Sequence, residues 1–104
     1  MTRPEALTLL ATAGMGWGDD WMLAYGQTFD PWTSEADSAG LVDGLAAKGW
    51  SMGLSYNSIA KIWTASMRLR PELRMDPVHD PDRKAAIADA AVRALGGKGN
   101  VTRT

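Results

Sequence analysis

Residues 50–69, which read WSMGLSYNSIAKIWTASMRL, decide the fold of this chain. Apolar residues alternate with small or polar residues in both halves of the stretch, at Trp50, Met52, Leu54 and Tyr56 and again at Trp63, Ala65, Met67 and Leu69. A period of two indicates β-strands with one buried face. Because Asn57 and Ser58 lie between the halves as a turn candidate, the stretch predicts an antiparallel hairpin. We expect Trp50 and Trp63 to be buried on its apolar face.

A first helix is predicted over residues 3–13, because Thr2 and Glu5 have the spacing of a capping box. A connector rich in glycine, tryptophan and aspartate follows over residues 14–31. Within this connector, residues 21–25 show a weak strand pattern.

A second helix is predicted over about residues 34–48, ending at Gly49, since glycine is favoured just after a helix. Two glycines inside it, Gly40 and Gly44, each cost roughly 1 kcal/mol relative to alanine. We therefore expect this helix to approach another surface closely, and the sheet is the expected surface.

A third helix is predicted over residues 81–95. Asp80 is its expected N-cap and Pro81 its first helical residue, because proline is tolerated in a first turn. Residues 70–79, which contain two prolines, are predicted to form a loop before it, and about residues 97–104 a loose polar tail.

Length and composition indicate a single α+β domain over residues 1–104, with three helices around a small antiparallel sheet that contains the hairpin 50–69. The chain has no cysteine, which excludes disulfide scaffolds, thiol catalysis and cysteine zinc sites. It contains no run of about 20 apolar residues and no secretory signal pattern. We therefore expect a cytoplasmic location.

Charge is divided unevenly along the chain. Residues 1–47 contain one basic and seven acidic residues, whereas residues 48–104 contain ten basic and five acidic residues. Two interpretations are open: the two halves complement each other within the fold, or the molecule has an acidic and a basic face that steer charged partners.

The order of the predicted elements and four short motifs resemble the phage ABA sandwich domain family of small bacteriophage proteins. The motifs are Met15-Gly16-Trp17, Pro31-Trp32-Thr33, Trp63-x-Ala65-x-Met67 and Pro81…Ala86-Ile87…Ala90-Ala91. Met67 and the long connector between Trp17 and Pro31 depart from the family's usual pattern. The resemblance implies an α-β-α sandwich with helices on both faces of the sheet, a phage or prophage origin, and the cytoplasm of a bacterial host. It transfers no catalytic residue.

The connector supplies the first candidate for a partner-binding surface, because tryptophans are preferred interface anchors and its acids have no basic residue among them. The candidate residues are Trp17, Asp19, Asp20, Trp21, Asp30 and Trp32. Core packing of the tryptophans and a solvated turn at the aspartates are the alternatives. A second candidate surface consists of Arg68, Arg70 and Arg74, which could follow a nucleic-acid backbone or form a solvated loop.

No combination of residues in the sequence indicates catalysis, a cofactor or a metal. His79 lies beside Asp76, Asp80 and Asp82, but a lone histidine cannot supply a zinc set, and helix capping explains the last two acids. The sequence has no Gly-x-Ser-x-Gly elbow.

These observations favour a non-catalytic accessory protein that binds a host protein, for example an inhibitor of a CRISPR or restriction nuclease. Neither direct nucleic-acid binding nor membrane binding is expected, and a homo-oligomer is compatible with the sequence. The alternative is a small-ligand or nucleotide-binding protein that uses the tryptophans of the connector as a stacking wall; an enzyme is the least favoured class.

Overall fold

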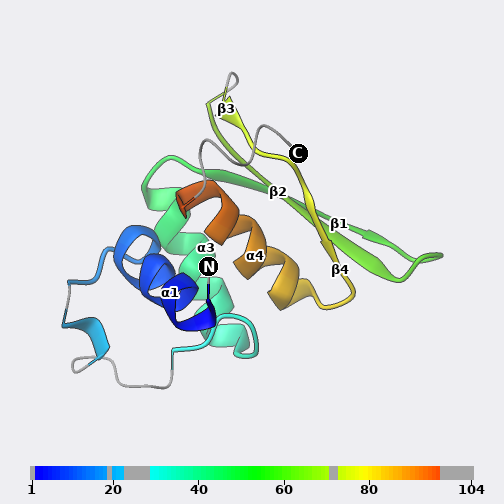
Figure 1. Ribbon diagram of the computed structural model, residues 1–104. Coiled ribbons are helices and arrows are strands. Elements are labelled where there is room, and N and C mark those ends of the chain that lie inside the picture. The colour runs from blue at the N-terminus through cyan, green and yellow to red at the C-terminus, as the bar shows by residue number, and fades with distance from the viewer. Residues whose placement is uncertain (1, 19, 23–28, 71–72, 97–104) are drawn as a thin grey trace.

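The computed structural model describes residues 2–18, 20–22, 29–70 and 73–96 (Figure 1). The elements are α1 (Arg3–Leu9), the π-helical turn η1 (Leu10–Gly14), α3 (Glu35–Ala47), β1 (Ser51–Asn57), β2 (Ile62–Arg70), β3 (Leu73–Arg74), β4 (Val78–Asp80) and α4 (Arg83–Gly96). The predicted α+β fold, with three helices and a small antiparallel sheet, is confirmed.

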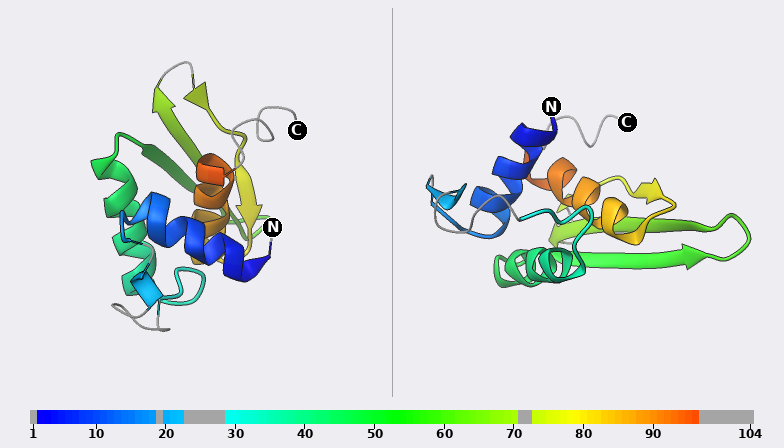
Figure 2. Two further views of the ribbon diagram at one scale, coloured as in Figure 1. Left: turned by 60° about the vertical axis from the view of Figure 1, so that its left-hand side comes forward. Right: turned by 90° about the horizontal axis from the view of Figure 1, so that it is seen from below.

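The hairpin forms as the alternation predicts. β1 and β2 pair antiparallel over seven residues of β1, with Met52 opposite Met67, Leu54 opposite Ala65 and Tyr56 opposite Trp63. These apolar pairs share the face that the helices cover. Trp50 and Trp63 pack against the core but are only half-buried, so the expectation that they are buried is wrong. The hairpin extends beyond the helices, which leaves its far end partly uncovered (Figure 2).

The hairpin turn is longer than the predicted Asn57-Ser58 turn. Residues 58–61 form it, and Lys61 adopts a left-handed conformation with φ of 59°. The Asn57 side-chain oxygen accepts hydrogen bonds from the amides of Ile59 (2.9 Å) and Ala60 (3.0 Å). Asparagine readily caps a turn in this way, and its side chain here satisfies two backbone donors of a longer loop.

The predicted loop over residues 70–79 is wrong, because two short strands lie within it. β3 and β4 pair one after the other along the side of β2 opposite β1, so the sheet is three strands wide. Between them, the Met75 amide donates a 3.0 Å hydrogen bond to the Met67 carbonyl. The backbone groups of β2 need partners on this side, and the segment supplies them although it has no clear strand pattern.

The helices lie on one side of the sheet (Figures 1 and 2). α4 packs beneath β2 and β4, α3 beneath the start of β1, and α1 with η1 against α3 and α4 on the far side. The helix layer therefore covers one sheet face, whereas the family resemblance implied helices on both. Fully buried side chains between the layers include Leu10, Leu41, Leu45 and Met67.

The capping box predicted for the first helix is confirmed, whereas the predicted start of the last helix is wrong. The side chain of Thr2 accepts from the Glu5 amide and that of Glu5 from the Thr2 amide, and Ser34 caps α3. α4 begins at Arg83, and the Asp82 carboxylate accepts from the Lys84 amide. The predicted start at Asp80–Pro81 is therefore wrong, because Asp80 is the last residue of β4.

The two glycines of α3 do mark a close approach, but the neighbour is η1 and not the sheet. A Cβ atom at Gly44 would lie 2.8 Å from the Gly14 carbonyl oxygen, and one at Gly40 would lie 3.5 Å from the Met15 methyl. Backbone therefore meets backbone where α3 crosses the end of η1, which only glycine at position 44 permits without a shift.

Candidate functional site on the uncovered face of the sheet

The tryptophans of the connector belong to the core. The exposed fractions of Trp21 and Trp32 are 3% and 6%, and Trp17 is half-buried against the core. Phe29 packs edge-on against two of them, with ring centroids 4.9 Å from Trp17 and 6.1 Å from Trp21. Buried rings cannot anchor a partner, so the predicted role of Trp21 and Trp32 in partner binding is corrected.

One acidic residue of the connector, Asp30, takes part in local hydrogen bonds. The Asp30 carboxylate accepts hydrogen bonds from the Trp32 amide (3.1 Å) and the Thr33 hydroxyl (2.8 Å), and it thereby holds the turn before α3. Asp20 is exposed, whereas Asp19 lies outside the described residues, as do residues 23–25 of the weak strand pattern. Trp21 and Met22 are helical and not extended. This segment covers the core, and among its described rings only Trp17 is partly accessible.

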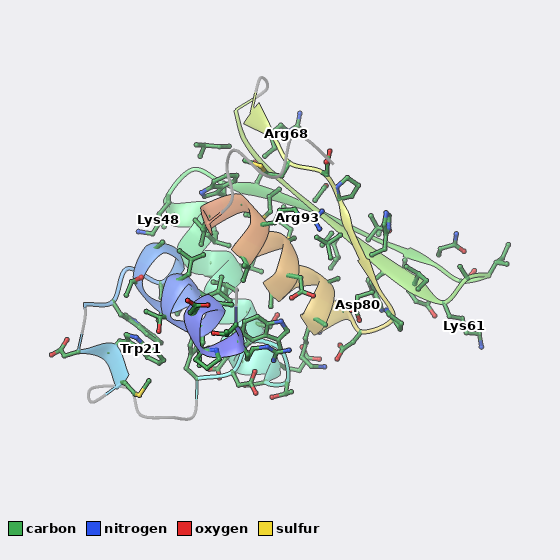
Figure 3. All side chains as sticks on the ribbon, in the orientation of Figure 1. Trp21, Lys48, Lys61, Arg68, Asp80 and Arg93 are labelled. Carbon is green, nitrogen blue, oxygen red and sulfur yellow. The ribbon has the colours of Figure 1, made fainter. Side chains whose placement is uncertain are left out.

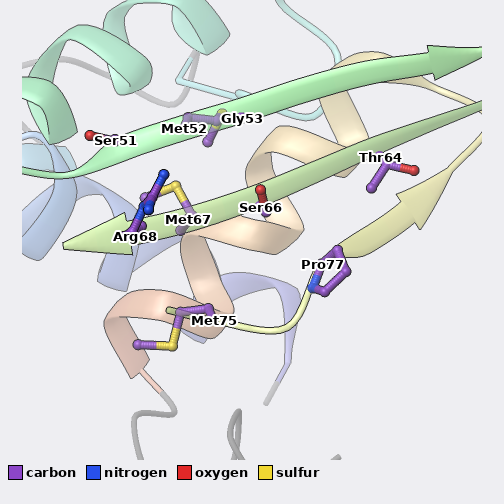
Figure 4. Close-up of a pocket in the computed structure, with 9 residues that line it drawn as sticks. All are labelled: Ser51, Met52, Gly53, Thr64, Ser66, Met67, Arg68, Met75 and Pro77. Carbon is purple, nitrogen blue, oxygen red and sulfur yellow. The ribbon is translucent and has the colours of Figure 1, made fainter. Parts of the chain in front are cut away.

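The uncovered face of the sheet carries three rows of polar or small side chains. Because register partners share a face, the rows follow from the pairing. They are Ser51–Arg68, then Gly53–Ser66, then Ser55–Thr64–His79. Figure 4 shows Ser51, Ser66 and Arg68 on the face that points away from α4. None of the helices in the described parts of the chain covers this face.

A hollow of about 460 Å³ lies between these rows and the segment that joins β3 to β4 (Figure 4). Hydroxyl groups of Ser51, Thr64 and Ser66 line it together with Arg68 and Pro77. Gly53 keeps the hollow open, since a Cβ atom there would lie 3.0 Å from the Ser66 hydroxyl. The site can therefore donate and accept hydrogen bonds over a shallow surface and presents a cation at one end.

The predicted basic surface lies at that end. Arg68 is exposed on β2 (Figure 3). Arg74 is its register partner on β3, and Arg70 is the last residue of β2. The sequence analysis placed Arg68 at the end of the predicted hairpin and Arg70 and Arg74 in the loop after it; in the structure Arg74 lies on β3 as the register partner of Arg68.

The polar groups around His79 serve local structure. The His79 Nδ1 atom and the Thr64 hydroxyl share a 2.9 Å hydrogen bond across β4 and β2. The Asp80 carboxylate accepts from the Asp82 amide at 2.8 Å, as expected of a turn before a helix. Within the described ranges, no group of three histidine or acidic side chains is placed to hold a metal ion.

Ion pairs link the acidic and basic halves of the chain. Glu35 on α3 binds Arg83 and, at 3.6 Å, Lys84 on α4. The hydrogen bond from Arg83 lowers the pKa of the Glu35 carboxyl below its ordinary value. Hydrogen bonds from Thr2 likewise lower the pKa of Glu5 at the start of α1. The two halves therefore complement each other at least here, as the first interpretation of the charge pattern expects.

The serine and threonine rows were missed as a site by sequence reasoning. Ser51, Gly53 and Ser55 alternate with the apolar residues of β1, so the signal was present. Which face stays uncovered depends on the packing of α3 and α4, which the alternation does not specify.

Comparison with known proteins adds no relative. No protein-family model matches the chain, and neither the curated proteins nor the solved structures include a match. Among the helices that the structure describes, none is long and apolar enough to cross a membrane.

Proposed function

We propose that this chain is a non-catalytic protein that binds an acidic surface of a partner protein with the uncovered face of its sheet. The observation that supports this most is the exposed Arg68, which lines the hollow together with the hydroxyl groups of Ser51, Thr64 and Ser66. Arginine is favoured at protein interfaces, since its guanidinium group binds carboxylates through two parallel hydrogen bonds.

A protein partner is favoured over nucleic acid by charge. The chain has a net charge of −1 and a pI near 5.7, whereas nucleic-acid-binding domains are usually strongly basic. An acidic protein surface needs only a local basic end, such as that around Arg68, to steer association.

The biological setting is proposed from the family resemblance alone. It suggests a phage or prophage accessory protein that acts in the bacterial cytoplasm, and an inhibitor of a host defence nuclease is the form we propose. Burial of Trp21 and Trp32 removes the main support for the alternative, a nucleotide-binding protein.

The absence of cysteine allows a clean cross-linking test. Ser66→Cys places a single thiol on the uncovered face, and Ala46→Cys places one on the exposed surface of α3 as a control. Each variant is labelled with a photoactivatable maleimide and irradiated in a bacterial lysate. We expect one specific protein adduct from position 66 and none from position 46.

A charge reversal then tests the basic end. Arg68→Glu should abolish the adduct at position 66, whereas Lys48→Glu, an equal charge change at the exposed end of α3, should leave it intact. Loss of the adduct in both variants, or an adduct that is a nucleic acid, would contradict the proposal. A rise in melting temperature with nucleotides would support the alternative instead.

A further inference from the structure

The outer edge of β1 has no strand beside it in the described parts of the chain. β1 pairs with β2 on one side only, and the other residues of the sheet lie beyond β2. Its seven residues, Ser51–Asn57, include no charge and no proline. Natural proteins usually protect such an edge, because its free amide and carbonyl groups can pair with another strand.

Apolar exposure increases along β1 toward the hairpin turn. Met52 is half-buried, whereas Leu54 is 41% and Tyr56 48% exposed on the face that the helices cover elsewhere. α3 lies beneath the Ser51 end of the strand, and the Tyr56 end extends past it (Figure 2). One end of β1 therefore has a helix beneath it and the other end lacks one.

A groove of about 330 Å³ runs between β1 and the two helices at the covered end, lined by Met52, Leu54, Ser38 and Val42 among others. The groove adjoins Leu54, so the exposed apolar surface of β1 continues into it.

We propose that β1 pairs antiparallel with β1 of a second copy of this chain, with Leu54 opposite Leu54 of that copy. Pairing of all seven residues fixes this register about a two-fold axis. Met52 then lies opposite Tyr56, Gly53 opposite Ser55, and Ser51 opposite Asn57. Apolar residues meet apolar residues on one face and small polar residues meet on the other, so no charge is buried.

The two ends of β1 complement each other in this arrangement. Antiparallel pairing brings α3 of the second copy, with its groove, beside the uncovered Tyr56 end of the first. Tyr56 of one copy is then the register partner of Met52 of the other, a residue that lines the groove.

Charge also favours a second copy as the occupant. The exposed acid Asp43 of α3 lines the groove, while the hairpin turn beyond Tyr56 carries Lys61. The pairing brings the turn of each copy toward the groove of the other. This inference does not depend on the proposed function, although it would join the two uncovered sheet faces into one.

Sedimentation analysis of the intact chain tests the association. We expect a concentration-dependent species of twice the 11.2 kDa chain mass. Leu54→Lys, which adds a charge at the centre of the paired edge, should yield a monomer, and circular dichroism checks its fold. Ile59→Lys adds the same charge at a residue 94% exposed in the turn, outside the paired strand, and should still dimerise.

A single cysteine at position 54 of each copy tests the register of the paired strands. Leu54→Cys should form a disulfide-linked dimer rapidly under mild oxidation, because directly opposite residues in antiparallel strands have Cα atoms about 4.5–5.5 Å apart, within disulfide range. Ile59→Cys, although more exposed, should form it only slowly.

Hydrogen exchange of the unmodified chain tests the pairing without any substitution. Amides of residues 51–57 should gain protection as protein concentration rises. A monomer at every concentration, or a dimer that survives Leu54→Lys, would overturn the proposal. Protection of β1 only when a different protein is added would overturn it too, and would assign the edge to a strand of that protein.

Discussion

The indole N–H of Trp32 donates a 2.9 Å hydrogen bond to the carboxylate of Asp89, a residue 57 positions later on α4. On the ring of the same tryptophan lies the guanidinium group of Arg3, 4.1 Å from the ring centroid. Trp32 thus connects the turn before α3 with the start of α1 and the middle of α4. A side chain with these two contacts organises the helix layer and is not free to bind a partner.

Asp89→Ala should destabilise the protein by about 1–3 kcal/mol, because it leaves the N–H of a buried indole without its acceptor. Urea denaturation measures the change. Asp20→Ala removes an exposed carboxylate from the connector and should change stability by no more than about 0.5 kcal/mol. Equal effects of the two substitutions would show that the Trp32–Asp89 bond does not contribute.

Trp21→Ala should lower the free energy of unfolding by about 3–5 kcal/mol, the usual loss for truncating a buried tryptophan. A loss of this size is a large part of the stability of a small domain. The adjacent Met22 is 47% exposed, so Met22→Ala serves as the matched control and should have little effect. Fluorescence-monitored unfolding compares them. A Trp21→Ala protein of unchanged stability would return this residue to the candidate binding surface.

The sequence was most informative where a pattern is local. The period of two over residues 50–69 predicted the hairpin, and the capping box of Thr2 and Glu5 predicted where the first helix begins. The length of the turn was not predicted. Two amides of the longer turn bind the Asn57 side chain, and a pattern of apolar residues contains no information about such hydrogen bonds.

Features that depend on distant parts of the chain were not predictable in this way. Burial of Trp32 depends on Asp89 and Arg3, and the strand conformation of β3 and β4 depends on the free side of β2. The arginines of the candidate site were visible in the sequence. Their gathering at Arg68 was not, because it follows from the register with Arg74.

The acid dependence of stability should include a contribution from Glu35. Its pKa is lowered mainly by the hydrogen bond from Arg83, so the stabilisation is fully present above the unfolded-state pKa and is lost as pH falls through the folded-state value. Glu35→Gln should therefore be less stable than the unmodified chain near neutral pH, and the difference should vanish in acid. Urea midpoints across the acid range measure this, with Asp20→Asn as the control for a lost surface charge. A difference that is constant with pH would contradict the assignment to this ion pair.

Gly44 and Gly40 offer the sharpest test of the packing between α3 and η1. Replacing either glycine with alanine favours the helix intrinsically by roughly 1 kcal/mol. At Gly44 the new Cβ would lie 2.8 Å from the Gly14 carbonyl oxygen, a backbone atom that cannot move aside, so we expect a net loss of about 1–3 kcal/mol.

At Gly40 the nearest atom is the flexible methyl of Met15 at 3.5 Å, an ordinary contact. Gly40→Ala should therefore leave stability unchanged or raise it by up to about 1 kcal/mol. Because the two substitutions are chemically identical and lie one turn apart on the same helix, opposite shifts in thermal unfolding can only come from what each Cβ meets. Stabilisation by both would mean that α3 does not approach the backbone of η1, and the helix layer would then need a different packing.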